Sequence, residues 1–275
     1  IMQNYKPKKK KKSNQASGVF KGIWIALLFF SVFILVQNRK QLYSYYKKIT
    51  VSKPLFSKNE SHYTHATKIF DAHDNHTFGI DVSHYQGKIN WSENMSLYNE
   101  IPIDFVILRA SAGSNVADKK FKINFKQAKI YKYALGAYHY YRPNENSTLQ
   151  AENFLKQTQY LKFHFPPILD IERVPKTQSM ERLKEGLKNW LQIVERKTGR
   201  KPILYSGEHF YETHLQNDFS NYPLWIANYN FWRKSMEDDW HFWQFSEKGR
   251  VEGIKTPVDV NVSSYTKVEL EKLMR

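Results

Sequence analysis

Pro167-Ile168-Leu169-Asp170-Ile171-Glu172 is a short apolar segment that carries two carboxylates. Its nearly continuous apolar residues are typical of a β-strand that is covered on both faces, as in a parallel sheet. Ionised carboxylates within such a strand are costly unless they are paired or have a function. The segment therefore predicts a buried strand whose acidic groups are paired or functional.

Similar short apolar segments recur on both sides of this one. Together they give eight expected strands, at Phe78–Ser83, Asp104–Ala110, Leu135–Tyr141, Pro167–Glu172, Pro202–Ser206, Leu224–Tyr229, His241–Phe245 and Val258–Val262. Apolar residues at helical spacing predict helices between the early strands, at Lys119–Lys132, Thr148–Leu161 and Ser179–Lys197. Strands that alternate with helices favour an α/β fold with a parallel sheet.

Eight strands predict a barrel related to the (β/α)8 fold. Residues 78–275 number only 198, which is at the lower limit for that fold. Because the last gaps between strands are too short for full helices, we expect five βα units followed by three strands, an irregular (β/α)5β3 barrel. A doubly wound open sheet is the structural alternative.

Four acidic residues lie on or beside the expected strands: Asp81, Asp170, Glu172 and Asp259. In a barrel the C-terminal ends of the strands converge on one mouth, where active sites occur. Asp170 and Glu172 are two positions apart, so both point to the same side, with Cα atoms about 6.5–7 Å apart. Two carboxyl groups at such a distance suit cleavage of a glycosidic bond, because like-charge neighbours keep one of them protonated. Structural carboxylates that cap barrel loops are the other interpretation.

Aromatic side chains crowd the same strand ends, at Tyr138, Trp225, Tyr229 and Trp243. Sugar rings stack on such faces, although many strand aromatics belong to an ordinary core. His139 could serve as a base, but a lone strand histidine is more typically packed or substrate-facing. Ser206-Gly207 lacks the G-x-S-x-G pattern of a serine nucleophile, and the sequence has no phosphate-binding glycine motif.

The N-terminal part of the chain contains one long apolar segment. Val19–Val36 is apolar apart from Lys21 and Ser31, and a helix of this length spans about 27 Å, close to the hydrocarbon thickness of a bilayer. The lysines between Lys6 and Lys12 orient the N-terminus toward the cytoplasm. No small-residue cleavage site follows the segment, which argues against a signal peptide. We expect a basic segment at 1–18, a transmembrane helix at 19–36, a linker at 37–77 and a folded domain at 78–275.

The net charge of +16 does not indicate nucleic-acid binding, because it is concentrated near the N-terminus. Residues 1–56 hold 12 Lys and Arg and no Asp or Glu, which leaves 30 basic and 26 acidic side chains in the rest of the chain. The absence of cysteine excludes disulfides and thiolate chemistry. His62, His65, His73 and His76 are more typical of solvated linker histidines than of metal ligands, and we expect no metal and no cofactor.

A set of motifs runs in order through residues 78–262. It comprises Gly79–Gly87 with Ile89-Asn90-Trp91, Phe105–Ala110, Asp118, Phe121, Asn124, Ala128, Gly136–Tyr140, Gln150-Ala151, Leu169–Glu172, Ile203–Gly207, Leu224–Tyr229, Phe242–Ser246 and Val258–Asn261. In this order and spacing the motifs resemble the glycoside hydrolase family 25 lysozymes, the Chalaropsis-type N-acetylmuramidases.

The resemblance implies a β-1,4-N-acetylmuramidase that acts on the glycan strands of peptidoglycan. It implies that Glu172 is the general acid and that Asp170 orients or stabilises the 2-acetamido group of the substrate. Asp81 and Asp259 would complete the acidic cleft. The residues expected to bind substrate are Tyr138, Arg109, Trp225, Tyr229, Trp243, Gln244 and Asn261.

The chain departs from the family after the second strand. Where the family usually has Lys-Ala-Thr/Ser-Glu-Gly, this sequence has Arg109-Ala110-Ser111-Ala112-Gly113, so an acid is missing at the edge of the cleft. We expect a monomeric enzyme on the outer side of the cytoplasmic membrane, held there by its single-pass helix. A chitinase-like hydrolase of another amino-sugar polymer and a non-catalytic, membrane-anchored glycan-binding module are the alternatives.

Overall fold

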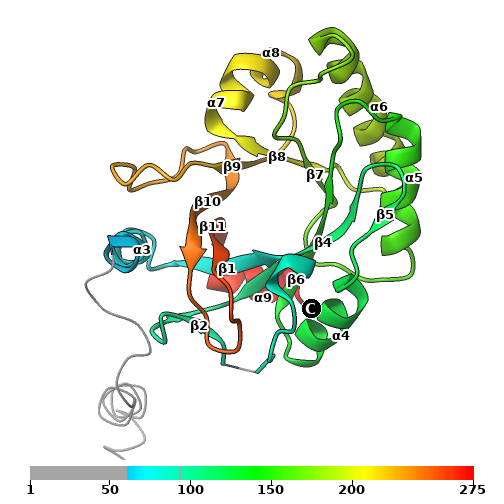
Figure 1. The fold of residues 1–275 in the computed structure, drawn as a ribbon. Coiled ribbons are helices and arrows are strands. Elements are labelled where there is room, and N and C mark those ends of the chain that lie inside the picture. Colours follow the sequence, from blue (N-terminus) through cyan, green and yellow to red (C-terminus); the bar gives the residue numbers. More distant parts are fainter. Residues whose placement is uncertain (1–60, 93) are drawn as a thin grey trace, which may run out of the picture. The chain divides into compact units, whose positions relative to one another are not determined.

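A closed barrel of eight strands forms the centre of this computed structural model, which describes residues 61–92 and 94–275 (Figure 1). In their order around the barrel the strands are β1 (His76–Val82), β4 (Phe105–Ala112), β6 (Ala134–Tyr140), β7 (Ile168–Asp170), β8 (Ile203–Gly207), β9 (Leu224–Ala227), β10 (Trp240–Gly249) and β11 (Val258–Thr266). β11 returns to β1 and closes the ring. All eight expected strands are confirmed, and the open-sheet alternative is wrong.

Neighbouring strands from β1 to β10 are parallel, whereas β11 is antiparallel to both β10 and β1. The change of direction follows from chain length, because the short connection from β10 to β11 allows only a hairpin. Two minor pairings complete the sheets of the described residues: β5 (Val116–Ala117) on the end of β4, and the hairpin β2 (Ser96–Leu97) with β3 (Ile101–Pro102).

Helices connect the parallel strands on the outside of the ring. The three expected helices are confirmed as α4 (Phe121–Ile130), α5 (Ser147–Thr158) and α6 (Met180–Thr198), which lie along one side of the barrel in Figure 1. A further helical run links β8 to β9: α7 (Glu208–Phe210), the π-helical turn η2 (Tyr211–Leu215) and α8 (Gln216–Phe219).

The prediction of five βα units is wrong for the first of them. The connection from β1 to β4 contains a single 3-10 turn, η1 (His84–Gln86), and the β2–β3 hairpin, without an α-helix. Its apolar residues Ile89, Trp91 and Met95 are buried, although their spacing is not helical. Four of the five expected βα units are therefore present.

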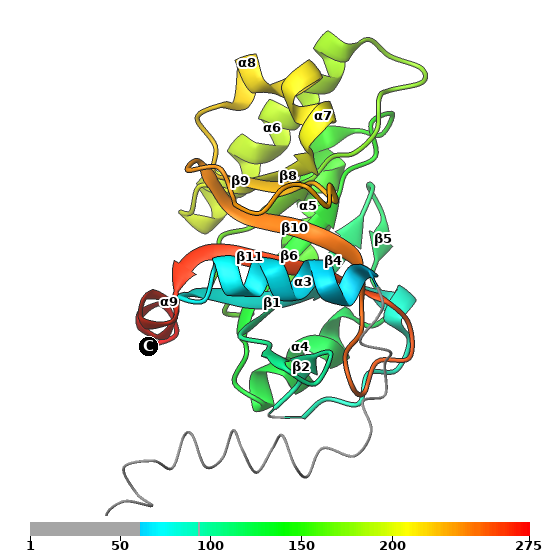
Figure 2. The same ribbon diagram turned by 90° about the vertical axis from the view of Figure 1, so that its left-hand side faces the viewer.

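Helix α3 (Ser61–Ala72) lies against β10 on the side of the barrel opposite α4–α6 (Figures 1 and 2). Of the linker expected over 37–77, residues 61–77 are corrected, because they form α3 and the start of β1. The prediction that the histidines of this region are solvated is wrong for His65 and His73, which are buried in this interface. The expected transmembrane helix at 19–36 and the linker residues 37–60 lie outside the described residues. Within the described part of the chain, no helix has the length and apolar character needed to cross a bilayer.

The inside of the barrel is filled except at its mouth. Phe105, Phe165 and Phe242 pack edge to face, with ring centroids 5.1–5.5 Å apart, and Leu270 from α9 (Lys267–Leu273) joins the same cluster. Gly79 allows β1 to pass this layer, because a Cβ there would lie 2.4 Å from the Phe105 carbonyl oxygen. The aromatic layer leaves space only at the C-terminal ends of the strands.

Candidate active site

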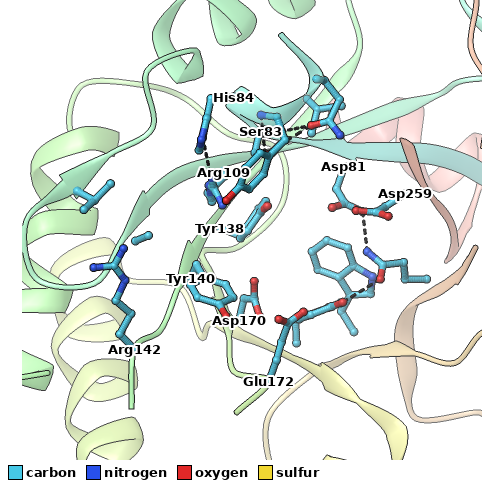
Figure 3. A pocket seen from close by; sticks show the side chains of 18 of the residues that line it. Asp81, Ser83, His84, Arg109, Tyr138, Tyr140, Arg142, Asp170, Glu172 and Asp259 are labelled. Atoms are coloured by element: carbon cyan, nitrogen blue, oxygen red, sulfur yellow. Dashed lines mark hydrogen bonds between the residues drawn. The ribbon is translucent and has the colours of Figure 1, made fainter. Parts of the chain in front are cut away.

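A cavity of about 500 Å³ opens at the C-terminal ends of the strands (Figure 3). All four predicted carboxylates line it: Asp81 from β1, Asp170 from the end of β7, Glu172 two residues further on, and Asp259 from β11. Residues distant in the sequence meet here because Asp81 and Asp170 lie at the C-terminal ends of parallel strands, where the antiparallel β11 begins with Asp259.

Asp81 is held by two side-chain amides. Its Oδ2 accepts one hydrogen bond of 2.8 Å from Gln244 Nε2 and another of 2.8 Å from Asn261 Nδ2. The indole N–H of Trp225 donates to Asn261 Oδ1 at 2.8 Å, which fixes the orientation of that amide. The carboxylate is therefore positioned before any substrate binds.

Asp81 and Asp259 face each other directly across the antiparallel β1–β11 pair. Burial raises the pKa of Asp81, although the amides of Asn261 and Gln244 oppose the rise. Burial and then the negative charge of Asp81 raise the pKa of Asp259 further. Because two close carboxylates cannot both ionise easily, the pair shares one proton at neutral pH.

Asp170 is 5% exposed, and its buried Oδ1 has no hydrogen-bond partner among the described residues. Burial, followed by the charges of Glu172 and Asp81, raises the pKa of Asp170 well above its usual range, while Arg109 opposes the rise. An unpartnered buried carboxyl oxygen at a cavity wall is costly unless a ligand supplies the donor. The site is therefore shaped to receive an N–H or O–H group at Asp170.

Glu172 lies at the mouth of the cavity and is exposed to solvent. The surrounding protein nevertheless removes part of its water, and this burial raises the pKa of Glu172. The positive charge of Arg173 and a hydrogen bond with the Tyr205 side chain oppose that rise. A carboxyl group with a raised pKa beside open space can hold a proton and donate it to a bound substrate.

Four of the seven predicted substrate-binding residues line the cavity: Tyr138, Arg109, Trp225 and Gln244. Two others do not line the cavity but bond to residues that do. Tyr229 donates its hydroxyl to Gln244 Oε1 at 2.5 Å, and Asn261 is fully buried against Asp81.

The prediction that Trp243 binds substrate is wrong. Its indole is fully buried on the outside of the barrel, where Nε1 donates to the Asn228 carbonyl at 2.8 Å and the ring lies 6.2 Å from that of His73. Adjacent residues of a strand point to opposite faces. Since Gln244 points into the barrel, Trp243 must point out.

Arg109 is fixed to the wall rather than free. Its Nε donates to Asp118 Oδ2 at 3.0 Å, its terminal nitrogen contacts His84 Nδ1, and its guanidinium lies 5.0 Å from the centre of the Tyr85 ring. The His84 backbone N–H also donates to Asp118, at 3.0 Å. Ala112, at the position of the missing acid, lines the same cavity.

The sequence-based prediction missed several lining residues, among them Tyr85, Tyr140, Arg142, Arg173 and Tyr205. Tyr140 could have been found, because it lies two positions after Tyr138 and so shares its face. Arg142 and Arg173 follow strand ends in loops, where no periodic pattern indicates their direction. His139 is packed: it is fully buried between Ser111 Oγ at 2.8 Å and Gln150 Oε1 at 3.2 Å.

A barrel mouth that gathers four carboxylates, with protons retained among them, defines the class of barrel glycoside hydrolases. The sequence profile described as Glycosyl hydrolases family 25 matches residues 80–254, and the chain belongs to this family.

Two relatives illustrate the range of similarity. The uncharacterized protein YegX of Escherichia coli K12 is 38% identical over 196 residues, which cover 70% of this chain and 71% of YegX. Lysozyme M1 of Streptomyces globisporus is 30% identical over 198 residues, covering 66% of each chain.

Solved structures share the fold. A family 25 glycosyl hydrolase from Bacillus anthracis superposes with a TM-score of 0.63 at 26% identity, covering 73% of this chain and 94% of that one. A bacterial lysozyme from Streptomyces coelicolor gives a TM-score of 0.63 at 28% identity, covering 72% and 97%.

Proposed function

We propose that this protein is a peptidoglycan hydrolase that cleaves the β-1,4 bond between N-acetylmuramic acid and N-acetylglucosamine. The observation that carries the proposal is the set of four carboxylates at the mouth of a family 25 barrel. The relative named Lysozyme M1 supports the same substrate class.

Glu172 is the proposed general acid. Breaking a glycosidic bond releases a poor alkoxide leaving group, which needs a proton as the bond lengthens. The raised pKa of Glu172 favours the protonated form that a general acid needs, and its place at the open mouth lets the glycosidic oxygen approach. Asp81 and Asp259 share a proton and so limit the negative charge around it.

Asp170 is the proposed partner of the substrate's 2-acetamido group. The acetamido N–H would satisfy the buried Oδ1, which has no partner among the described residues. A hydrogen bond to the ionised form lowers a carboxyl pKa, so substrate binding favours the anion. The anion then steadies positive charge that develops on the sugar as the bond breaks.

The proposal includes a location. The apolar segment 19–36, preceded by lysines, would anchor a monomeric enzyme in the cytoplasmic membrane with the barrel on the outer side, where peptidoglycan is found. The sequence pattern supports this placement.

Digestion of purified peptidoglycan by the full chain tests the reaction. Borohydride reduction of the products should give muramitol, because cleavage of this bond creates a muramic acid reducing end. Glucosaminitol in its place would contradict the proposed bond. Chitin as the better substrate would favour the chitinase-like alternative, and binding without new reducing ends would favour the glycan-binding module.

Glu172→Gln is the matched variant, since glutamine keeps the shape of the side chain but has no acidic proton. We expect it to lose about 10²–10⁴-fold in rate, toward the upper end for an alkoxide leaving group. Asp170→Asn should also be severely impaired, while peptidoglycan binding largely survives. Circular dichroism and thermal melting check that both variants fold. A folded Glu172→Gln protein with near wild-type activity would remove Glu172 from the acid role.

A further inference from the structure

The cavity has two sides of opposite charge. Figure 3 shows Asp81 and Asp259 on one side, with Arg109 and Arg142 across from them, and Arg173 lines the same cavity. Arg109 is already bonded to Asp118, but Arg142 and Arg173 lie where an incoming ligand can reach them. This arrangement calls for a substrate with an anionic group beside its reacting bond.

We propose that Arg142 and Arg173 form a binding site for a carboxylate on the peptide that the muramic acid residue carries. The proposal rests on the proposed function and adds to it a requirement for a negatively charged side group. The sugar rings themselves carry hydroxyl and acetamido groups, which are neutral.

Both the backbone and the guanidinium group of Arg142 are held by hydrogen bonds. Its N–H donates to Gln150 Oε1 at 2.9 Å and its carbonyl accepts from Gln150 Nε2 at 3.0 Å, and Gln150 is fully buried. The guanidinium donates to Glu145 Oε1 at 3.1 Å, which uses one of its five N–H groups. With 43% of the side chain exposed, the remaining donors are accessible.

Glu145 offsets part of the charge of Arg142, but it bonds only one N–H group of the guanidinium, and its other oxygen is turned to Ser114. Oε2 accepts from the Ser114 backbone N–H at 2.6 Å and from Ser114 Oγ at 2.9 Å. Opposite Tyr140 in the β4–β6 register stands Ala112, whose methyl group adds no acid to this wall. On this side of the cavity the two arginines have two carboxylate neighbours: Glu145, which is bonded to Arg142, and Glu172, which precedes Arg173 in the chain.

Arg173 is the second cation beside Tyr140. Its guanidinium carbon lies 6.0 Å from the centre of the Tyr140 ring, and it makes no ion pair with a carboxylate within the described part of the chain. Burial and the charges of Glu172 and Asp170 raise the pKa of Tyr140, while Arg173 and Arg142 oppose the rise. Both cations therefore act on the same phenol, and two guanidinium groups so placed suit a carboxylate.

Kinetics on peptidoglycan with and without its charge test the site. Carbodiimide amidation followed by washing gives strands with neutral carboxamides. For the wild-type full chain we expect amidation to raise KM about tenfold with little change in kcat. Arg142→Gln and Arg173→Gln should raise KM about tenfold on untreated strands and respond little to amidation. Arg196→Gln, an exposed arginine on α6 outside the cavity, should behave as wild type.

Strands stripped of peptides by an amidase test whether the peptide supplies the carboxylate. In untreated strands the lactyl carboxyl is amide-bonded to the peptide, so the free carboxylates there belong to the peptide. A wild-type KM raised as on amidated strands supports the peptide site, provided that both arginine variants lose the discrimination. A wild-type KM that stays as low as on untreated strands would overturn it.

A binding assay separates this proposal from the proposed reaction. Sedimentation of Glu172→Gln protein with untreated and amidated strands measures affinity without turnover. Equal affinity for the two, or discrimination that persists in Glu172→Gln/Arg142→Gln and Glu172→Gln/Arg173→Gln proteins, would overturn the carboxylate site. Absence of muramitol from wild-type digests would instead overturn the reaction, while the binding ratio still decides the site.

Discussion

Glu172 and Arg173 are neighbours in the chain, and they affect the proton donor in opposite directions. Burial raises the pKa of Glu172, and the positive charge of Arg173 lowers it. A general acid works only when protonated, so activity should fall as the pH rises through the pKa of Glu172.

Arg173→Gln removes the opposing charge and should raise that pKa. We expect the alkaline limb of the kcat/KM profile to move to higher pH by roughly half a unit, since the pair is near solvent. Release of muropeptides between pH 4 and 9 measures the shift, with Arg196→Gln as the control. An alkaline limb that stays in place would show that another group controls it.

Gln244 and Trp243 are adjacent in β10 but point to opposite faces, so their variants test which face of the strand serves the reaction. Gln244→Ala removes a hydrogen bond to Asp81, so kcat should fall about tenfold or more while KM changes little. Trp243→Phe leaves the Asn228 carbonyl without its donor on the outer face, which should cost about 1–3 kcal/mol of stability. Its kcat and KM should stay at the wild-type values.

Steady-state kinetics and denaturant unfolding of both β10 variants check this contrast. A raised KM in folded Trp243→Phe would restore Trp243 to the substrate site. Full activity in Gln244→Ala would mean that Asp81 does not need its amide partners.

The sequence could predict the carboxylates of the site because each interrupts or ends an apolar strand, where a charge is costly without a purpose. By alternation along a strand, Trp243 and Gln244 cannot both face the cavity, so only one of the two could bind substrate. Arg142 and Arg173 could not be found in this way. Their positions depend on Gln150, Glu145 and Tyr140, which are contacts of the folded loops.

At the scale of elements, all eight strands were predictable because burial on both faces leaves a continuous apolar pattern. The first crossover was not, because its partners are distant in sequence. Asn90 N–H donates to the Gly253 carbonyl and Tyr98 N–H to the Arg250 carbonyl, both at 2.9 Å. No local pattern in residues 83–104 indicates a hairpin that depends on the turn between β10 and β11.

Helix α3 was missed for a related reason. Its buried residues His65, Ala66 and Ile69 form one stripe along the helix. Because histidine counts as a polar residue, the stripe does not give the apolar pattern that predicts a buried helix face. In the fold, the His65 ring lies 4.5 Å from that of Phe231, and its buried Nε2 has no partner among the described residues. A neutral imidazole packs there as an apolar side chain.

The packing of His65 should make the docking of α3 sensitive to acid. Burial, followed by the charges of His62 and Lys68, lowers the pKa of His65, and burial also lowers that of His73. Groups with a lowered pKa in the folded state are neutral in both states above the unfolded pKa of about 6.5. As the pH falls below that value the unfolded form takes up protons first, so stability is lost.

We therefore expect the melting temperature to fall between pH 7.5 and 5.5, and to fall less in His65→Leu, which cannot be protonated. The remaining decrease in the variant belongs to His73 and to other titrating groups. Differential scanning fluorimetry of both proteins at the two pH values measures the difference. Equal decreases in wild type and His65→Leu would show that His65 does not couple α3 to pH.

On the scale of the whole molecule, charge and hydropathy divide the chain. The basic excess lies in residues 1–56, next to the only long apolar segment of the sequence, and the rest is nearly balanced. A barrel that hydrolyses peptidoglycan needs neither feature for its chemistry. Both features suit a segment that crosses a membrane with its lysines on the cytoplasmic side.

The full chain should therefore sediment with membranes and resist extraction by high salt, because an apolar span is held by the hydrocarbon core and not by charge. Protease added from the outer side should release a soluble, active barrel by cutting between residues 37 and 60. Leu28→Arg places a charge near the centre of the segment at a cost of about 2.5–3.5 kcal/mol, so it should reduce the membrane-bound fraction while leaving hydrolysis of purified peptidoglycan unchanged. Recovery of the wild-type full chain in the soluble fraction would contradict the anchor, and resistance of the barrel to external protease release would contradict its orientation.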